Sequence, residues 1–159
     1  MTEGELETRN SKLATRNSQL SNPMRPHLGK LVGKKALGTD IGLFQIELTE
    51  AAGKEQFANY RPGQFAFVSA LGVGEAPFGI ASIPSSGLLE FGIARLGSVT
   101  GALHALELGE TLGVRGPLGN CFPMDDIKGK NIVVLGGGIG GAPLRPVINT
   151  ILENRNDYG

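Results

Sequence analysis

A glycine cluster at residues 136–141 follows directly on a run of apolar residues at 132–135. Gly136, Gly138 and Gly141 have the spacing G-x-G-x-x-G, in which glycines let the backbone approach a pyrophosphate and the following helix N-terminus offers N–H groups to the anion. Glycine-rich turns also serve as tight connections, and this chain has 25 glycines. The apolar run before the cluster favours nucleotide binding, because this fingerprint follows a strand.

Two elements would have to position this loop. The run at residues 132–135 is rich in β-branched side chains and predicts a strand buried on both faces of a parallel sheet. Residues 143–154 predict a helix, and Pro143 suits its first turn. Pro146 would forfeit a helical hydrogen bond unless the helix starts near Leu144, so we expect a longer loop than the motif indicates. One strand makes no sheet, and we expect its apolar faces to need partners beyond this chain.

The composition is that of an ordinary globular protein. The 159 residues are 40% hydrophobic and 19% charged, and no apolar run approaches the roughly 20 residues needed to cross a bilayer. The polar N-terminus lacks the pattern of a secretory signal, so we expect a cytoplasmic protein with no membrane span. The 15 basic and 15 acidic side chains give no formal net charge, which argues against attraction to nucleic acid.

Residues that commonly hold metals are scarce in this sequence. Cys121 is the single cysteine, which excludes an intrachain disulfide and a cluster held by several cysteines of this chain. We expect it to be a small packing residue in a loop. His27 and His104 are too few and too isolated to indicate a metal site or a catalytic triad. His104 falls in a short helical pattern and is expected to be a surface or half-buried structural residue.

Residues 1–26 are expected to form a disordered polar tail. They contain a near repeat at heptad spacing, T-R-N-S-K-L-A and T-R-N-S-Q-L-S, within a stretch that places three leucines on one helical stripe. One apolar position per heptad is too few for a coiled-coil seam. The alternative is a tail that folds as a helix against a partner subunit and is separated from the folded domain by Pro23 and Pro26.

From residue 27 to about residue 117, short strand patterns alternate with turns, which is typical of an antiparallel sheet. Phe44, Ile46 and Leu48, for example, alternate with polar residues as a half-buried strand requires. The pattern predicts strands at residues 31–37, 42–49, 64–71, 77–83, 88–95 and 111–115, with one short helix at 98–106.

These patterns predict an all-β antiparallel (Greek-key) barrel with one short helix, followed by the first βα unit of an incomplete α/β nucleotide-binding domain. Antiparallel and parallel elements seldom share one small sheet, so we expect two separate parts. We place the barrel domain at residues 27–125 and the α/β fragment at residues 130–159. The length allows one domain and part of another.

Three segments occur in an order and spacing that resemble the ferredoxin-NADP reductase superfamily. They are R-P-G-Q-F at residues 61–65, A-P-F-G-I-A-S at 76–82 and G-G-G-I-G-G-A-P-L-R at 136–145. The fuller stretches G-V-G-E-A-P-F-G-I-A-S and V-R-G-P-L-G-N-C-F-P look most like flavin-binding subunits of multi-subunit redox complexes. That group includes hydrogenase gamma subunits, the flavin-binding subunit of anaerobic sulfite reductase and the electron-transfer subunit of dihydroorotate dehydrogenase.

The resemblance implies a flavin site on the barrel. In the family, the arginine of an R-x-Y-S motif meets the pyrophosphate, the aromatic ring packs on the isoalloxazine, and the serine hydrogen-bonds near N5. The matching positions here are Ala76, Pro77, Phe78 and Gly79. Phe78 can still stack on the ring system, whereas Ala76 has no charge and Gly79 has no hydroxyl.

The family also places a basic residue and a G-x-x-T pattern after the next strand. Arg95 could supply the missing charge, while Thr100 and backbone N–H groups at the start of the short helix could meet the phosphates. Taken singly, Phe78 could be a core aromatic and Arg95 a solvated charge, but together they favour flavin binding. The expected flavin residues are Phe78, Gly79, Ile80, Ile93, Ala94, Arg95, Gly97, Val99 and Thr100.

The glycine loop matches the family form G-x-G-x-G-x-A-P, where the family binds the nicotinamide nucleotide. The expected contacts are Gly136, Gly138, Ile139, Gly140 and Pro143. The resemblance implies FAD as the flavin, with FMN as the less favoured choice, and NAD or NADP as substrate. Family members of this branch also carry a cysteine-bound 2Fe–2S cluster, for which we expect no ligands in this chain.

The resemblance further implies an oxidoreductase subunit that passes electrons between NAD(P)H and the iron–sulfur clusters of partner subunits. The chemistry would belong to the flavin, so no side chain is predicted to be catalytic, and we expect this chain to be inactive alone. Two alternatives stay open. One is a non-catalytic assembly or regulatory fragment without flavin, which Ala76 and Gly79 favour. The other is the N-terminal piece of a longer or split protein.

Overall fold

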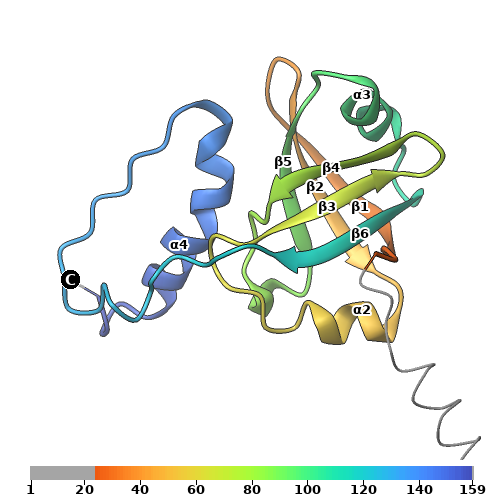
Figure 1. Ribbon diagram of the computed structural model, residues 1–159. Coiled ribbons are helices and arrows are strands. Elements are labelled where there is room, and N and C mark those ends of the chain that lie inside the picture. Colours follow the sequence, from red (N-terminus) through yellow and green to blue (C-terminus); the bar gives the residue numbers. More distant parts are fainter. Residues whose placement is uncertain (1–23, 159) are drawn as a thin grey trace, which may run out of the picture.

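The computed structural model describes residues 24–158, so the predicted disordered tail lies almost wholly outside the described residues. Within this range six antiparallel strands form a barrel-like body, beside which a long loop and a further helix lie (Figure 1). The strands are β1 (His27–Gly38), β2 (Ile41–Leu48), β3 (Phe65–Ala70), β4 (Gly74–Gly79), β5 (Leu89–Ala94) and β6 (Thr111–Leu118). The helices are α2 (Ala51–Gln56), α3 (Ser98–Ala105) and α4 (Gly141–Glu153), with short 3-10 helices η1 (Pro84–Ser86) and η2 (Gly138–Gly140).

The strands form one antiparallel sheet in the order β4-β3-β6-β1-β2-β5. β6 returns from the end of the barrel sequence to lie between β3 and β1, the long-range return of a Greek key. Ile80, directly after β4, forms an isolated bridge with Phe91 of β5, and the N–H of Ala81 donates to the carbonyl of Glu90 at 2.7 Å. The sheet therefore curls until its two ends meet locally without closing fully, which confirms the predicted barrel-like fold.

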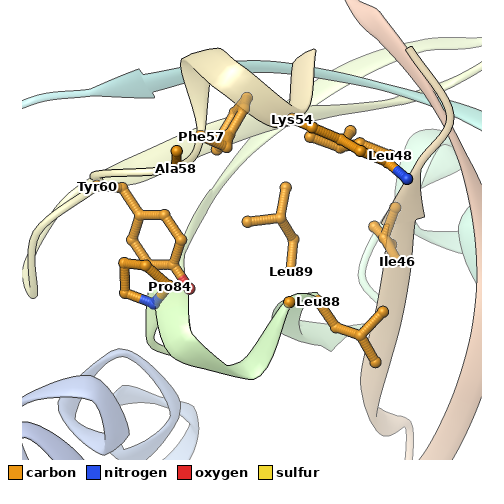
Figure 2. Close-up of a pocket in the computed structure, with 10 residues that line it drawn as sticks. Ile46, Leu48, Lys54, Phe57, Ala58, Tyr60, Pro84, Leu88 and Leu89 are labelled. Carbon is orange, nitrogen blue, oxygen red and sulfur yellow. The ribbon is translucent and has the colours of Figure 1, made fainter. Parts of the chain in front are cut away.

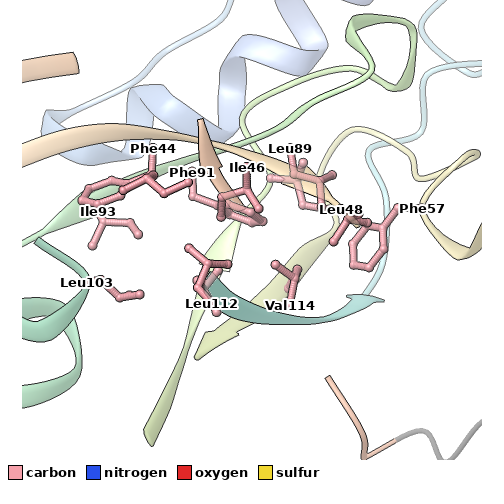
Figure 3. Close-up of a cluster of buried hydrophobic side chains, with 14 of the residues drawn as sticks. Phe44, Ile46, Leu48, Phe57, Leu89, Phe91, Ile93, Leu103, Leu112 and Val114 are labelled. Atoms are coloured by element: carbon pink, nitrogen blue, oxygen red, sulfur yellow. The ribbon is translucent and has the colours of Figure 1, made fainter. Parts of the chain in front are cut away.

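The hydrophobic core lies inside the curled sheet. Phe44 and Phe91 face each other across the β2–β5 ladder, and both are fully buried. Figure 3 shows these two rings and Ile46 facing Leu112 and Val114 of β6. The alternating pattern that predicts a half-buried strand at β2 is therefore confirmed by the burial of its apolar residues.

Alternation along β5 divides its residues between the core and the outside. The buried ones are Leu89, Phe91 and Ile93. Glu90, Gly92 and Ala94 lie on the outer face, because successive side chains of a strand point to opposite sides. α4 packs on this outer face, since a Cβ atom added to Gly92 would lie 2.6 Å from the Cβ of Ala142.

The two short helices lie at different ends of the barrel (Figure 1). α3 is predicted from the sequence and places Leu103 in the core. The sequence pattern does not predict α2, which is held to β1 by His27: its ring nitrogens lie 3.2 Å from Glu50 Oε2 and 2.9 Å from Gln56 Oε1. Gly53 permits this contact, because a Cβ there would lie 2.9 Å from the His27 side chain. Tertiary contacts therefore determine α2.

β4 and β6 differ from their predicted limits. β4 begins at Gly74 and ends at Gly79 instead of continuing to residue 83. In the ladders it pairs only with β3, and such an edge strand tolerates Pro77. β6 continues past Arg115, because Leu118 still pairs with Phe65 of β3. The limits of β4 and β6 are therefore set by how far each of them pairs with β3.

The predicted parallel strand at residues 132–135 does not form. Val133 and Leu135 are 82% and 88% exposed, and no second strand in the described part of the chain pairs with this segment. The helix that follows is confirmed, but α4 begins at Gly141 and contains Pro146. The expected longer loop is therefore wrong: Pro146 gives up one helical hydrogen bond, and its side chain is fully buried.

Candidate functional site

A cleft of about 300 Å³ lies between the barrel and the glycine loop. Its barrel wall comes from the ends of β4 and β5 and from the start of α3, and its other wall comes from η2 and the first turn of α4. It brings residues expected for the flavin together with residues expected for the nucleotide. The lining residues are Pro77, Phe78, Gly79, Gly92, Ala94, Leu96, Thr100, Ile139, Gly140 and Pro143.

Phe78 is the aromatic residue of the barrel wall. It lies near the end of β4, opposite Ala66 of β3 in the ladder. Its ring is partly buried and packs against the hydrophobic core, as does the side chain of Val99 from α3. The ring is therefore fixed by the core and still lines the cleft, so that a planar ligand could stack on it.

The start of α3 supplies polar groups to the cleft. Thr100 Oγ1 accepts hydrogen bonds from the N–H groups of Leu96 and Gly97, both at 2.9 Å, and donates to the Gly97 carbonyl at 3.1 Å. The Thr100 hydroxyl is thus engaged in capping the helix. The N–H groups of Ser98, Val99 and Thr100 belong to the first turn, which has no preceding helical carbonyl, and they are the donors that an anion would meet.

The glycine-loop wall meets the barrel at two glycines. A Cβ atom added to Gly79 would lie 2.7 Å from the Cβ of Pro143, and one added to Gly92 would lie 2.6 Å from the Cβ of Ala142. A side chain at either position would therefore force α4 or the strand to move. Gly79, which stands where the family motif has a serine, is the residue that lets Pro143 pack on the barrel.

A partly buried ion pair joins α4 to β5. Arg145 Nη1 donates to Glu90 Oε2 at 2.8 Å, and the two side chains are 40% and 12% exposed. Gln45 Nε2 donates to the other carboxylate oxygen of Glu90 at 2.7 Å. Each oxygen of this largely buried carboxylate therefore has a donor, which offsets the free energy of its desolvation.

Comparison with known proteins finds relatives whose names describe subunits of larger enzymes, although no family model matches the chain. The chain is 36% identical over 127 residues to the sulfhydrogenase 2 subunit gamma of Pyrococcus furiosus, a match that covers 80% of this chain and 44% of the relative. It is 41% identical over 86 residues to a Methanocaldococcus jannaschii protein named "Probable dihydroorotate dehydrogenase B (NAD(+)), electron transfer subunit", with 54% and 30% covered.

A solved NADH-dependent reduced ferredoxin-NADP oxidoreductase, studied for flavin-based electron bifurcation, matches this structure with a TM-score of 0.67 and 29% identity. The match covers 79% of this chain and 44% of that chain. This chain belongs to the ferredoxin-NADP reductase superfamily. It spans less than half the length of these relatives.

For a member of this superfamily, the cleft fits the flavin ring better than the flavin phosphates. Its lining is largely apolar and includes Phe78, and the described residues that line it carry no cation. Arg95 lines a separate cleft of about 310 Å³ together with Lys34, Lys35 and His104. Consecutive residues of an extended chain point to opposite sides, so Ala94 reaches the first cleft and Arg95 the second.

The other residues expected to bind ligands in this superfamily member lie near the cleft without lining it. Ile80 and Ile93 are 1% and 0% exposed and belong to the core, so only their backbone groups could reach a ligand. Gly97 and Val99 lie at the start of α3. Of the remaining two, Gly136 lies in the loop before η2 and Gly138 is the first residue of η2.

Sequence reasoning missed Gly92, Leu96 and the Glu90–Arg145 pair. A lone glycine within a strand pattern indicates a close approach by another backbone, and Gly92 in L-E-F-G-I-A carries that signal. No local pattern relates Glu90 to Arg145, because 55 residues separate them in the chain.

A second, largely apolar cavity of about 230 Å³ lies beside α2 (Figure 2). The Tyr60 hydroxyl lies 2.8 Å from Ser82 Oγ, and burial raises the pKa of Tyr60 to about 12. Lys54 is the one charged residue among those that line the cavity, and its ammonium nitrogen lies 3.6 Å from a carboxylate oxygen of Glu47. The cavity therefore offers no cluster of reactive groups.

Within its described part, the protein shows neither a cluster of candidate metal ligands nor a helix able to span a membrane. Residues 24–158 contain no group of three His, Cys, Asp or Glu side chains placed to hold a metal ion. Cys121 is a free, half-exposed thiol. His104 is half-buried as predicted, with Nε2 3.0 Å from the carbonyl of Ile93. None of the helices described between residues 24 and 158 has the length and hydropathy of a membrane span.

Proposed function

We propose that this chain is the flavin-binding part of an electron-transfer subunit, which passes electrons between NAD(P)H and the iron–sulfur clusters of a partner redox complex. The observation that supports this most is the shared cleft, whose opposite walls carry residues expected for two different ligands. Transfer between a flavin and a nicotinamide needs the two rings to be held close together and in the right orientation. A cleft with these two walls suits that arrangement.

FAD is the proposed flavin, with FMN as the less favoured choice. Phe78 would pack on the isoalloxazine ring, a contact that adds about 1 kcal/mol beyond burial. The first N–H groups of α3 would donate to the phosphates. The flavin would supply the hydride and single-electron chemistry, while this chain's residues bind it, orient it and exclude water.

NAD or NADP is the proposed ligand of the glycine loop. Gly136, Gly138 and Gly140 would allow a pyrophosphate to approach the backbone. Ile139 and Pro143 line the cleft on this side. NAD and NADP are equal candidates, because none of the described residues that line the cleft carries a charge that would read the ribose.

The donor set of this chain does not fit an iron–sulfur cluster. Such a cluster is held by several ligands, mostly cysteine thiolates, and the chain has one cysteine, Cys121. We therefore assign the clusters of the proposed pathway to other subunits or to the parts of the longer relatives that this chain does not span. The relatives' names, which describe subunits of larger enzymes, support such partners.

The second candidate function is a non-catalytic assembly or regulatory unit that does not bind flavin. Two observations favour it. Gly79 is packed against Pro143 and carries no hydroxyl, and the charge of Arg95 belongs to the neighbouring cleft. Flavin phosphates would then meet neutral backbone donors, which are weaker partners than a guanidinium group.

A flavin-binding experiment separates these two functions. The protein is purified at its full encoded length, and its visible spectrum is recorded before and after incubation with FAD or with FMN. Bound flavin with altered absorbance and fluorescence supports the first function. A protein that stays colourless with both flavins, and still captures subunits of a redox complex in a pull-down, would establish the second.

The domain limits, 27–125 and 130–159, and the cytoplasmic location remain predictions. Limited proteolysis tests the limits, because cleavage in the connecting loop and in the C-terminal unit should precede cleavage in the barrel. Equal protection of both parts would contradict them. Fractionation of the source cells with an antibody against the chain tests the location.

A further inference from the structure

The contact between α4 and β5 is made by two matching faces. Glu90, Gly92 and Ala94 share the outer face of β5, and Ala142 and Arg145, three residues apart, share one face of α4. Gly92 meets Ala142, and Glu90 meets Arg145. Ala94, the third residue of the strand face, lines the cleft. The same strand face therefore both holds the helix and forms part of the ligand cleft.

The two kinds of contact constrain α4 differently. The glycines set how closely the helix can approach, because a Cβ at Gly79 or Gly92 would lie 2.7 Å or less from a side chain of α4. The ion pair limits sliding and rotation of the helix along the strand. Gln45 holds the Glu90 carboxylate from its other side at 2.7 Å, so Arg145 bonds to an acceptor that is itself fixed.

We propose that Glu90 and Arg145 are positioning residues, which hold the glycine-loop wall at a set distance from Phe78 across the cleft. Neither residue lines the cleft, so both act on a ligand through α4, in which Pro143 precedes Arg145 by two residues. The inference rests on the proposed function in one respect, namely that the cleft holds a flavin.

Besides the glycine contacts and the ion pair, a small apolar cluster that contains Ala142 holds α4 against the barrel. The segment before it pairs with no strand of the sheet, and Val133 and Leu135 are largely exposed. Among the described residues, Glu90–Arg145 is the ion pair that joins α4 to the barrel. Removing one partner leaves the other charge partly buried without its counterion, which weakens the attachment more than loss of an exposed pair would.

Hydrogen exchange of the full chain without flavin tests the attachment. Glu90→Gln and Arg145→Gln are each expected to speed exchange of the α4 amides about tenfold, as loss of a hydrogen bond to a charged group predicts. The double variant should match the faster single variant, because both residues act through one interaction. Lys54→Gln is the control: it removes the exposed pair between α2 and Glu47 and should leave α4 unchanged.

Unchanged α4 exchange in both single variants would overturn the proposal, as would a double variant in which the two effects multiply. Two glycine variants test whether α4 packs on β5 through the close glycine contact, without altering any charge. Gly92→Ala should also speed α4 exchange, whereas Gly38→Ala, where a Cβ meets nothing within 4 Å, should not. Equal exchange in these two variants would show that α4 is not seated on β5.

FAD titration of the same variants tests the positioning role. Arg145→Gln should weaken FAD binding by about threefold to tenfold, because the glycine-loop wall is then positioned against the barrel in fewer molecules. The urea midpoint of barrel unfolding should stay at the wild-type value. Arg145→Lys, which keeps a charged donor, should restore most of the affinity. Equal affinity in wild type and Arg145→Gln would overturn the positioning role. If wild type binds no flavin, the proposed function fails instead, and the flavin-free exchange still decides whether the pair seats α4.

Discussion

The wild-type protein is expected to lose stability as the pH rises from 10 to about 12, and the variant Tyr60→Phe is expected not to show this loss. Tyr60 is 4% exposed, and burial raises its pKa from 10.0 to about 12, a shift only partly offset by the hydrogen bond to Ser82. The folded protein therefore keeps the phenol proton over a range in which the unfolded chain has released it.

The sign and size of the effect follow from this difference. In that range the unfolded state binds fewer protons than the folded state, so the free energy of unfolding falls as the pH rises. A shift of two pKa units corresponds to about 2.7 kcal/mol. The stabilisation is complete below the unfolded pKa and is lost as the pH passes through the folded pKa. At neutral pH, Tyr60→Phe should cost only about 1 kcal/mol, because Ser82 Oγ keeps its hydrogen bond from the N–H of Glu90.

Urea unfolding of wild type, Tyr60→Phe and Tyr158→Phe, measured from about pH 9 to about pH 12, checks this prediction. Tyr158 is the second of the chain's two tyrosines and provides the matched control. By about pH 12, wild type and Tyr158→Phe should have lost about 2.3 kcal/mol more than Tyr60→Phe, and the full difference of about 2.7 kcal/mol is reached above that pH. Titrations of lysines are common to all three proteins and cancel in the differences. Parallel curves for the three proteins would refute the reasoning.

Three further substitutions have defined outcomes. Phe91→Ala empties a fully buried site in the core and should lower the free energy of unfolding in urea by about 3–5 kcal/mol; a loss below about 1 kcal/mol would contradict that packing. Thr100→Val removes the hydroxyl that caps α3 and should lower stability by about 1 kcal/mol, seen as a lower Tm. Phe78→Ala should weaken FAD binding at least about fivefold in a fluorescence titration, whereas Phe122→Ala, an aromatic that does not line the cleft, should not.

The barrel strands could be predicted because alternation in the sequence records which residues face the core. In β2, the alternating positions Phe44, Ile46 and Leu48 are buried in the core, and Leu43 on the opposite face is buried as well. α2 could not be predicted, because His27 holds it from another element. The apolar run at residues 132–135 has the composition of a buried strand, but composition cannot show whether neighbouring strands are present to pair with it.

The motif residues Phe78, Thr100 and Pro143 line one cleft, because each motif lies on an element that borders it. Motif matching could not show that Gly79 packs against Pro143, since that contact depends on how close α4 lies to the barrel. The side on which the Arg95 side chain points likewise depends on where β5 ends. These three-dimensional relations decide which ligand groups each residue can reach.

Hydrogen exchange of the full chain with and without saturating FAD tests most directly whether the cleft between barrel and glycine loop is the flavin site. We predict slower exchange on addition of FAD in the three segments that border the cleft, at residues 77–79, 94–100 and 138–143. No protection in these segments, or protection confined to the neighbouring cleft of Lys34, Lys35 and Arg95, would contradict the assignment.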